Sequence, residues 1–120
     1  MKVIIYNISQ DTKKSLALLN RKKHKITIIT DPLKDNNMHF SDEKDAVICD
    51  ETSISPSIVG KLNSFGVKYL ILRSMKQLPL QLANSEYHGL KCSKIEIDDS
   101  GSEAFQMIKI LDAWQAESMT

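Results

Sequence analysis

Short apolar runs alternate with amphipathic segments along the whole chain. Strand-like segments, most of them rich in Val, Ile or Leu, occur at residues 3–6, 25–29, 46–49 and 91–95 and within residues 66–74. Helix-like segments follow at about 11–22, 55–65, 78–87 and 102–117. Because neighbouring parallel strands need a crossover connection, this order predicts an α/β fold: a doubly wound, mostly parallel five-stranded sheet with helices on both faces.

Start and stop signals refine these elements. Ser55 followed by Pro56 is a typical helix start, and Gly66 is expected to end that helix. The first helix, Asp11 to Lys22, is expected to finish in a basic turn that suits its dipole. A shorter helix is predicted from Leu78 to Tyr87 and a long surface loop from Asp31 to Lys44.

The strand ends indicate where a ligand would lie. In open parallel sheets, ligands bind beyond the carboxyl ends of the strands, at the point where the strand order reverses. The candidate segments there are residues 7–10, 50–53 and 73–77.

Composition restricts the classes of function. A chain of 120 residues with 42% apolar and 26% charged side chains is expected to form one domain, residues 1–120. Its net charge of +1 favours no polyanion, and the basic run 21–25 is interpreted as a solvated helix end, so we expect no nucleic-acid partner. Without an apolar segment of spanning length we expect no membrane contact and a cytoplasmic protein.

Several kinds of chemistry lack their motifs. Cys49 and Cys92 are expected to be buried, reduced thiols, and the three histidines stand at no metal-ligand spacing, so no metal site is predicted. There is no G-x-S-x-G, Walker loop or G-x-G-x-x-G. Asp50, at the end of the third strand, leaves open a receiver-like role, although an acidic pair after the first strand is absent.

The order of several pieces resembles a known family. They are Asp45-Ala-Val-Ile-Cys49, then Ile54 to Leu62, Phe65-Gly-Val-Lys-Tyr-Leu-Ile-Leu-Arg-Ser74 and Tyr87-His-Gly-Leu-Lys-Cys92. Together they resemble the substrate-binding domain of the D-2-hydroxyacid dehydrogenases, particularly the D-lactate dehydrogenase branch. The resemblance implies a flavodoxin-like domain that, in complete enzymes, adjoins a Rossmann domain carrying NAD and the catalytic residues.

This resemblance places a candidate ligand loop after the fourth strand. It implies that Arg73, Ser74, Met75 and Lys76, with Asp50 beside them, surround a small carboxylate. The family's loop has a glycine whose freedom lets backbone amides approach the carboxylate, and Lys76 stands in its place, with Leu78 where an acidic or amide residue is usual. Lys76 is left as a point charge for an anion.

The last helix, about 102–117, has a broad apolar face. At about 100° per residue its apolar positions span roughly 160°, with Phe105 outside that arc. Met107, Ile110 and Trp114 are expected at its outer edge as a surface for a homodimer or a partner protein, unless the domain buries the whole face.

These observations predict a stand-alone substrate-domain relative that has no catalytic residue of its own and is expected to be inactive alone. It is expected to act by self-association, partner binding or small-anion binding. The alternative is one component of a split 2-hydroxyacid oxidoreductase, which would use NAD only when paired with a separate Rossmann domain. A receiver-like signalling domain is the third possibility.

Overall fold

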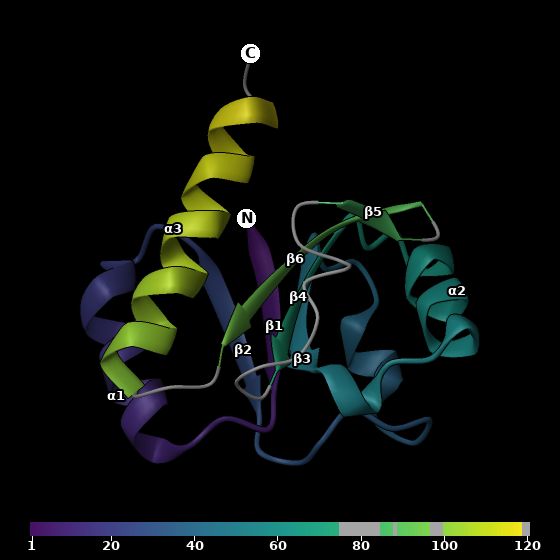
Figure 1. Cartoon of the computed structure of the whole chain (residues 1–120), viewed down its shortest axis with the longest axis horizontal. Helices are drawn as coiled ribbons and strands as arrows, with labels where there is room; N and C mark the ends of the chain where they lie inside the picture. The colour runs from purple at the N-terminus through teal and green to yellow at the C-terminus, as the bar shows by residue number, and fades with distance from the viewer. Residues whose placement is uncertain (75–84, 88, 97–99, 119–120) are drawn as a thin grey trace.

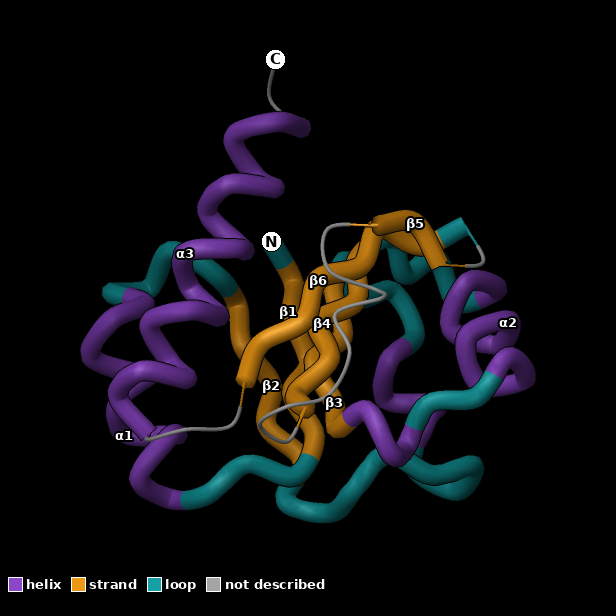
Figure 2. The backbone as a smooth tube through the Cα atoms, viewed as in Figure 1, coloured by secondary structure: helices purple, strands orange, loops and turns teal. Residues whose placement is uncertain are grey.

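A computed structural model describes residues 1–74, 85–87, 89–96 and 100–118 of the chain. Its single sheet has the strand order β2-β1-β3-β4-β6-β5 (Figures 1 and 2). The strands are β1 (Lys2–Tyr6), β2 (Lys25–Ile29), β3 (Ala46–Asp50), β4 (Tyr69–Ser74), β5 (Ser85–Tyr87) and β6 (Leu90–Glu96). The first five in this spatial order pair in parallel, which confirms the predicted doubly wound α/β fold.

Helices cover both faces of the sheet, as Figure 2 shows. The α-helices are α1 (Gln10–Asn20), α2 (Pro56–Ser64) and α3 (Ser100–Ser118), and two short 3-10 helices are η1 (Met38–Ser41) and η2 (Glu51–Ser53). α1 and α3 lie side by side on one face, where they form a core with alternate residues of the strands. α2 and the segment around η1 close the other face over a second core.

One predicted helix is partly wrong. Of the segment Leu78 to Tyr87, residues 75–84 lie outside the described part, but Ser85–Tyr87 forms β5, which pairs antiparallel with β6. Gly89 occupies the connecting turn with φ of +88°, a conformation that suits glycine. A three-residue strand is too short to show a periodicity, and its pairing with β6 determines its conformation.

The start of α2 confirms its sequence signal. Ser55 Oγ accepts a hydrogen bond from the Ile58 backbone N–H at 3.2 Å, and Pro56 is the first helical residue. The hydroxyl therefore satisfies an amide that has no partner within the helix.

The end of α1 corrects the predicted basic last turn. The helix ends at Asn20, and Arg21 and Lys22 follow with φ of +48° and +62°. The buried Asn20 amide donates to the His24 carbonyl at 2.8 Å, and its oxygen accepts from the His24 N–H at 2.9 Å. These two bonds replace further helix and place the basic residues in a tight turn before β2.

The segment Asp31 to Lys44 is not simply a surface loop. It contains η1, and its Leu33 and Met38 side chains are buried in the core on the α2 side. The Tyr6 hydroxyl, which reaches it from β1, lies 2.8 Å from Ser41 Oγ. The connection between β2 and β3 contains a 3-10 helix and no α-helix, and its buried side chains cover this part of the sheet.

α3 also differs from the expectation for its outer edge. Met107 is fully buried, Trp114 is 5% exposed and Ile110 is half-buried. The Trp114 ring stacks on Tyr69 of β4, with centroids 4.9 Å apart and planes inclined by 19°. Met107 and Trp114 therefore belong to the domain's own core and do not form the predicted association surface, whereas Phe105 is 57% exposed.

No helix within the described ranges is both long and apolar enough to cross a bilayer. In Figure 1, the last turns of α3 extend beyond the sheet and the other helices.

Candidate functional site at the carboxyl edge of the sheet

The switch in strand order lies between β1 and β3. The chain leaves β1 through α1 to reach β2 on one side, then returns to β3 on the other side of β1. Asn7 follows β1, Asp50 ends β3 and Arg73 lies near the end of β4, so these three residues meet at the carboxyl edge. This is the place where the rule for open α/β sheets locates a ligand.

Arg73 is the centre of a hydrogen-bonded ion network at this edge. Its Nη1 donates to the Asn7 carbonyl at 2.6 Å and to Asp50 Oδ1 at 3.0 Å, and its Nε donates to Glu103 Oε1. Glu103 belongs to the first turn of α3, so the network joins that helix to the sheet. The Arg73 and Glu103 side chains are both nearly buried, at 8% and 5% exposed. One cation here compensates two carboxylates, and the charges sum to −1.

Asn7 completes the network and joins three strands. Its φ of +61° is a left-handed conformation that asparagine tolerates better than most residues. Its backbone N–H donates to the Ile29 carbonyl at 2.9 Å, and its side-chain Nδ2 donates to Asp50 Oδ2 at 2.6 Å. Both oxygens of Asp50 therefore have donors, one from Asn7 and one from Arg73.

A second ion pair lies beside the first. Lys94 of β6 contacts Glu51 Oε1 of η2 at 2.7 Å, and the lysine side chain is 3% exposed. The other Glu51 oxygen, Oε2, is buried without a hydrogen-bond partner in the part of the chain that is described. Ser74 donates from Oγ to the Ile95 carbonyl of β6 at 3.3 Å.

The structure thus brings together part of the site predicted from sequence. Asp50, Arg73 and Ser74 lie on neighbouring strand ends, while Met75 and Lys76 fall outside the described residues. Glu51 belongs to the candidate segment 50–53, whereas Glu103 and Lys94 were missed. A signal for Lys94 exists, because alternation along β6 places it on the same side of the sheet as the buried Cys92.

The two cysteines offer no reactive thiolate. Cys49 on β3 and Cys92 on β6 are free and buried, with β4 between their strands. Burial raises the pKa of the Cys49 thiol far above its ordinary value and that of Cys92 to about 11. Within the described ranges, no three His, Cys, Asp or Glu side chains gather as a metal site requires.

Comparison with known proteins identifies the fold. No protein-family model and no curated protein sequence matches the chain. Among solved structures, D-lactate dehydrogenase from Escherichia coli matches 96% of this chain with a TM-score of 0.62 and 19% identity. The chain has the fold of one domain of these enzymes.

Two further matches agree. D-lactate dehydrogenase from Lactobacillus jensenii, solved with NAD+, covers 79% of this chain at a TM-score of 0.60 and 20% identity. The Salmonella D-lactate dehydrogenase covers 82% of this chain with a TM-score of 0.58 and 16% sequence identity. The present chain spans 40% of the E. coli chain and 30% of each of the other two. The expected flavodoxin-like fold is confirmed, and at these identities the likeness concerns the fold.

Proposed function

We propose that the chain is a relative of the D-2-hydroxyacid dehydrogenase substrate domain that does not catalyse hydride transfer alone and acts by self-association. The Arg73 network carries the first half of this proposal. A guanidinium that receives a substrate carboxylate needs free donors and a surplus of positive charge. The Nε and Nη1 groups of Arg73 instead donate to two carboxylates and to the carbonyls of Tyr6 and Asn7.

An anion would find unfavourable electrostatics at this edge. An anion at Arg73 would lie close to the Asp50 and Glu103 carboxylates, whose negative charges repel it. The network already has a net charge of −1, and the neighbouring Lys94 is paired with Glu51. The same occupancy of both Asp50 oxygens counts against a receiver-like phosphoacceptor.

The first prediction concerns hydride transfer. The purified chain should not oxidise NADH with pyruvate or longer 2-oxo acids, because it contains no G-x-G-x-x-G and because Asp50 and Glu103 lie against its Arg73. The measurement is NADH absorbance, with a complete D-lactate dehydrogenase as positive control. Turnover by the chain alone would disprove the proposal.

A second candidate function is one component of a split NAD-dependent oxidoreductase. The projection of the last turns of α3 beyond the rest of the domain favours it, since that segment is available to a second domain (Figure 1). In the same assay, NADH oxidation that requires a separately encoded Rossmann domain would support this candidate over a purely non-catalytic role.

The surface proposed for self-association lies on α1 and α3. Leu18 is 77% exposed, and Leu19 and Phe105 are also exposed. Leu19 and Phe105 flank a hollow of about 320 Å³ between the two helices. Exposed large apolar side chains around a hollow are typical of a protein contact.

A second copy suits the spacing of residues along α3. In an antiparallel contact between two α3 helices, centred between residues 110 and 111, Lys109 of one copy lies opposite Asp112 of the other, which also contacts Lys23 and His24 of its own chain. The same arrangement places each Phe105 near Ala116 of the other copy, which borders a hollow of about 300 Å³. The contact is isologous, because each pair occurs twice around the two-fold axis.

The second prediction is that the chain is a dimer and that Leu19→Ser with Phe105→Ser weakens it at least about tenfold. Burial of each side chain contributes about 1.5–3 kcal/mol, and 1.4 kcal/mol corresponds to tenfold. Light scattering over a concentration series measures the mass. Phe40→Ser is the matched control, because Phe40 is also exposed but lies in η1, on the α2 side of the sheet. A monomeric wild-type chain, or equal weakening by Phe40→Ser, would refute this surface.

A further inference from the structure

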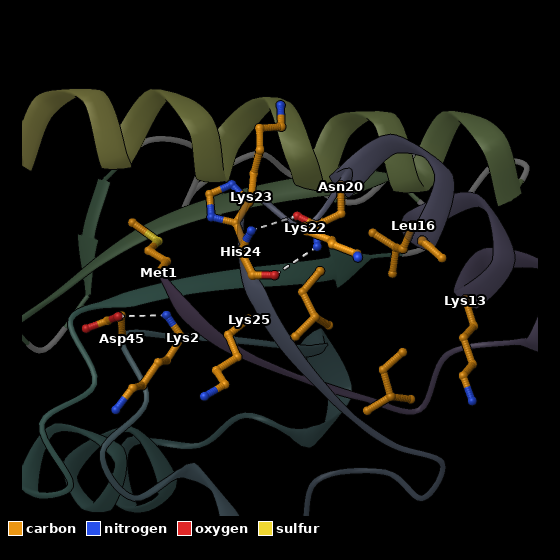
Figure 3. Close-up of a pocket in the computed structure, with 13 residues that line it drawn as sticks. Met1, Lys2, Lys13, Leu16, Asn20, Lys22, Lys23, His24, Lys25 and Asp45 are labelled. Atoms are coloured by element: carbon orange, nitrogen blue, oxygen red, sulfur yellow. Dashed lines mark hydrogen bonds between the residues drawn. The ribbon is translucent and has the colours of Figure 1, made fainter.

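A groove of about 840 Å³ lies over the open edge of the sheet at β2 (Figure 3), and no residue of the Arg73 network lines it. It is bounded by α1, the turn after it, and the amino-terminal ends of β1 and β2. Its lining comprises Met1, Lys2, Lys13, Leu16, Ala17, Asn20, Lys22, Lys23, His24, Lys25, Ile26, Ile28 and Asp45. This volume falls within the range of small-molecule sites.

The floor of the groove is apolar. Ile26 and Ile28 alternate along β2, so both face α1, and both stay half-buried because β2 is the edge strand. Leu16 and Ala17 contribute from α1, and Met1 from the chain start. An apolar body placed here would remove these side chains from water.

The rim of the groove is basic, although the whole chain has a net charge of only +1. Lys23 pairs with Asp112 at 2.8 Å, and the Asp45 carboxylate accepts from the Lys2 backbone N–H at 2.8 Å. Within the described part of the chain, no ion pair involves the ammonium groups of the four other lining lysines, Lys2, Lys13, Lys22 and Lys25. The groove therefore has an excess of positive charge.

The basic turn is held in place by buried contacts. Asn20 bonds both backbone groups of His24, as the dashed lines in Figure 3 show, and the His24 ring contacts Asp112 of α3 through Nε2 at 2.8 Å. Partial burial acts to raise the pKa of Asp112, but hydrogen bonds from Lys23 and His24 hold it below its ordinary value. Left-handed backbone at Lys22 has a conformational cost, which these contacts offset. The turn is thus fixed before any ligand arrives.

We propose that this groove binds a small organic anion with an apolar body, of the class of medium-chain carboxylates and alkyl phosphates. The body lies on Ile26 and Ile28, and the head group lies among the lysines of the rim. Inorganic anions lack contact with the floor, and an uncharged or cationic chain of the same length gains nothing from the rim. The site is separate from the carboxyl edge, and Ala17, Ile26 and Ile28, where its test is read, line neither hollow of the proposed self-association surface.

The experiment is a titration of the ¹⁵N-labelled full chain with octanoate and with octyl phosphate, followed by amide chemical shifts. Saturable shifts are expected at Ala17, Ile26 and Ile28, and the stronger of the two ligands identifies the preferred head group. Acetate, inorganic phosphate, octanol and octylamine serve as controls and should bind at least about tenfold more weakly, since each lacks either the body or the negative charge. Absence of saturable shifts, or equal binding of octylamine, would overturn the proposal.

Variants separate this site from general surface charge. Lys22→Gln with Lys25→Gln should weaken octanoate binding about tenfold, whereas Lys14→Gln with Lys34→Gln, an equal charge change outside the groove, should change it less than about twofold. Ala17→Phe should block binding by filling the groove, with the amide spectrum otherwise retained. Equal weakening by both lysine pairs, or unaltered binding to Ala17→Phe, would contradict the assignment.

Discussion

Replacing Arg73 with methionine is expected to lower the free energy of unfolding by about 3–5 kcal/mol. Methionine fills similar space but leaves Asp50 and Glu103, whose side chains are 19% and 5% exposed, without the cation that compensates them. It also leaves the Asn7 carbonyl without a donor. The measurement is urea unfolding followed by circular dichroism, with the wild-type slope as a check on two-state behaviour.

Two comparisons isolate the cause. Lys61→Met removes the cation of an exposed ion pair with Asp35, 3.3 Å long, and should cost less than about 1 kcal/mol. Adding Asp50→Asn and Glu103→Gln to Arg73→Met should restore part of the lost stability, because the uncompensated charges disappear. A loss below 1 kcal/mol for Arg73→Met, or no recovery in the triple variant, would mean that the network contributes little to folding.

The position of this network at the carboxyl edge was predictable from the sequence, but the contact of Glu103 with Arg73 was not. Strand ends in a parallel sheet meet at one edge, so Asp50 and Arg73 were expected there. Glu103, however, comes from a helix 30 residues after Arg73 and contacts it only because α3 crosses that edge. Sequence patterns show which face of each helix or strand is apolar. They do not show which acidic side chain, distant in the sequence, will pair with a given arginine.

The same limit explains the differences in the fold. Hydrophobic runs of four to six residues identify the parallel strands, because burial on both faces demands apolar side chains throughout. β5 depends on pairing with β6 and has no such run, and the end of α1 depends on the Asn20 side chain bonding to His24. Local chemistry of this kind changes boundaries without changing the hydrophobic period.

α3 illustrates what a wide apolar face does and does not establish. The arc correctly identified Met107 and Trp114 as apolar contacts, but their cover is the sheet and Tyr69 of the same chain. Phe105, outside the arc, is the large apolar side chain of α3 that faces solvent. Periodicity therefore identifies the helix face that packs in the chain's own core. A large apolar residue outside that face is the better indicator of a surface for another copy.

Replacing Trp114 with alanine should consequently change stability and leave the assembly state unaltered. The side chain is 5% exposed and stacks on Tyr69, so the loss of contact and the cavity left behind should cost about 3–5 kcal/mol. Thermal unfolding measures this cost. Light scattering at a temperature where the variant remains folded should give the same mass as the wild-type chain.

Phe105→Ala is the control from the same helix. Its side chain is 57% exposed, so the variant should unfold within about 1 kcal/mol of the wild type, while any self-association weakens. The Trp114 variant should therefore lose stability and keep its assembly state, whereas the Phe105 variant should keep its stability and associate more weakly. The reason is that Trp114 belongs to the core and Phe105 to the surface. If Trp114→Ala instead dissociates the protein at unchanged stability, Trp114 is not a core residue and the packing of α3 on Tyr69 is wrong.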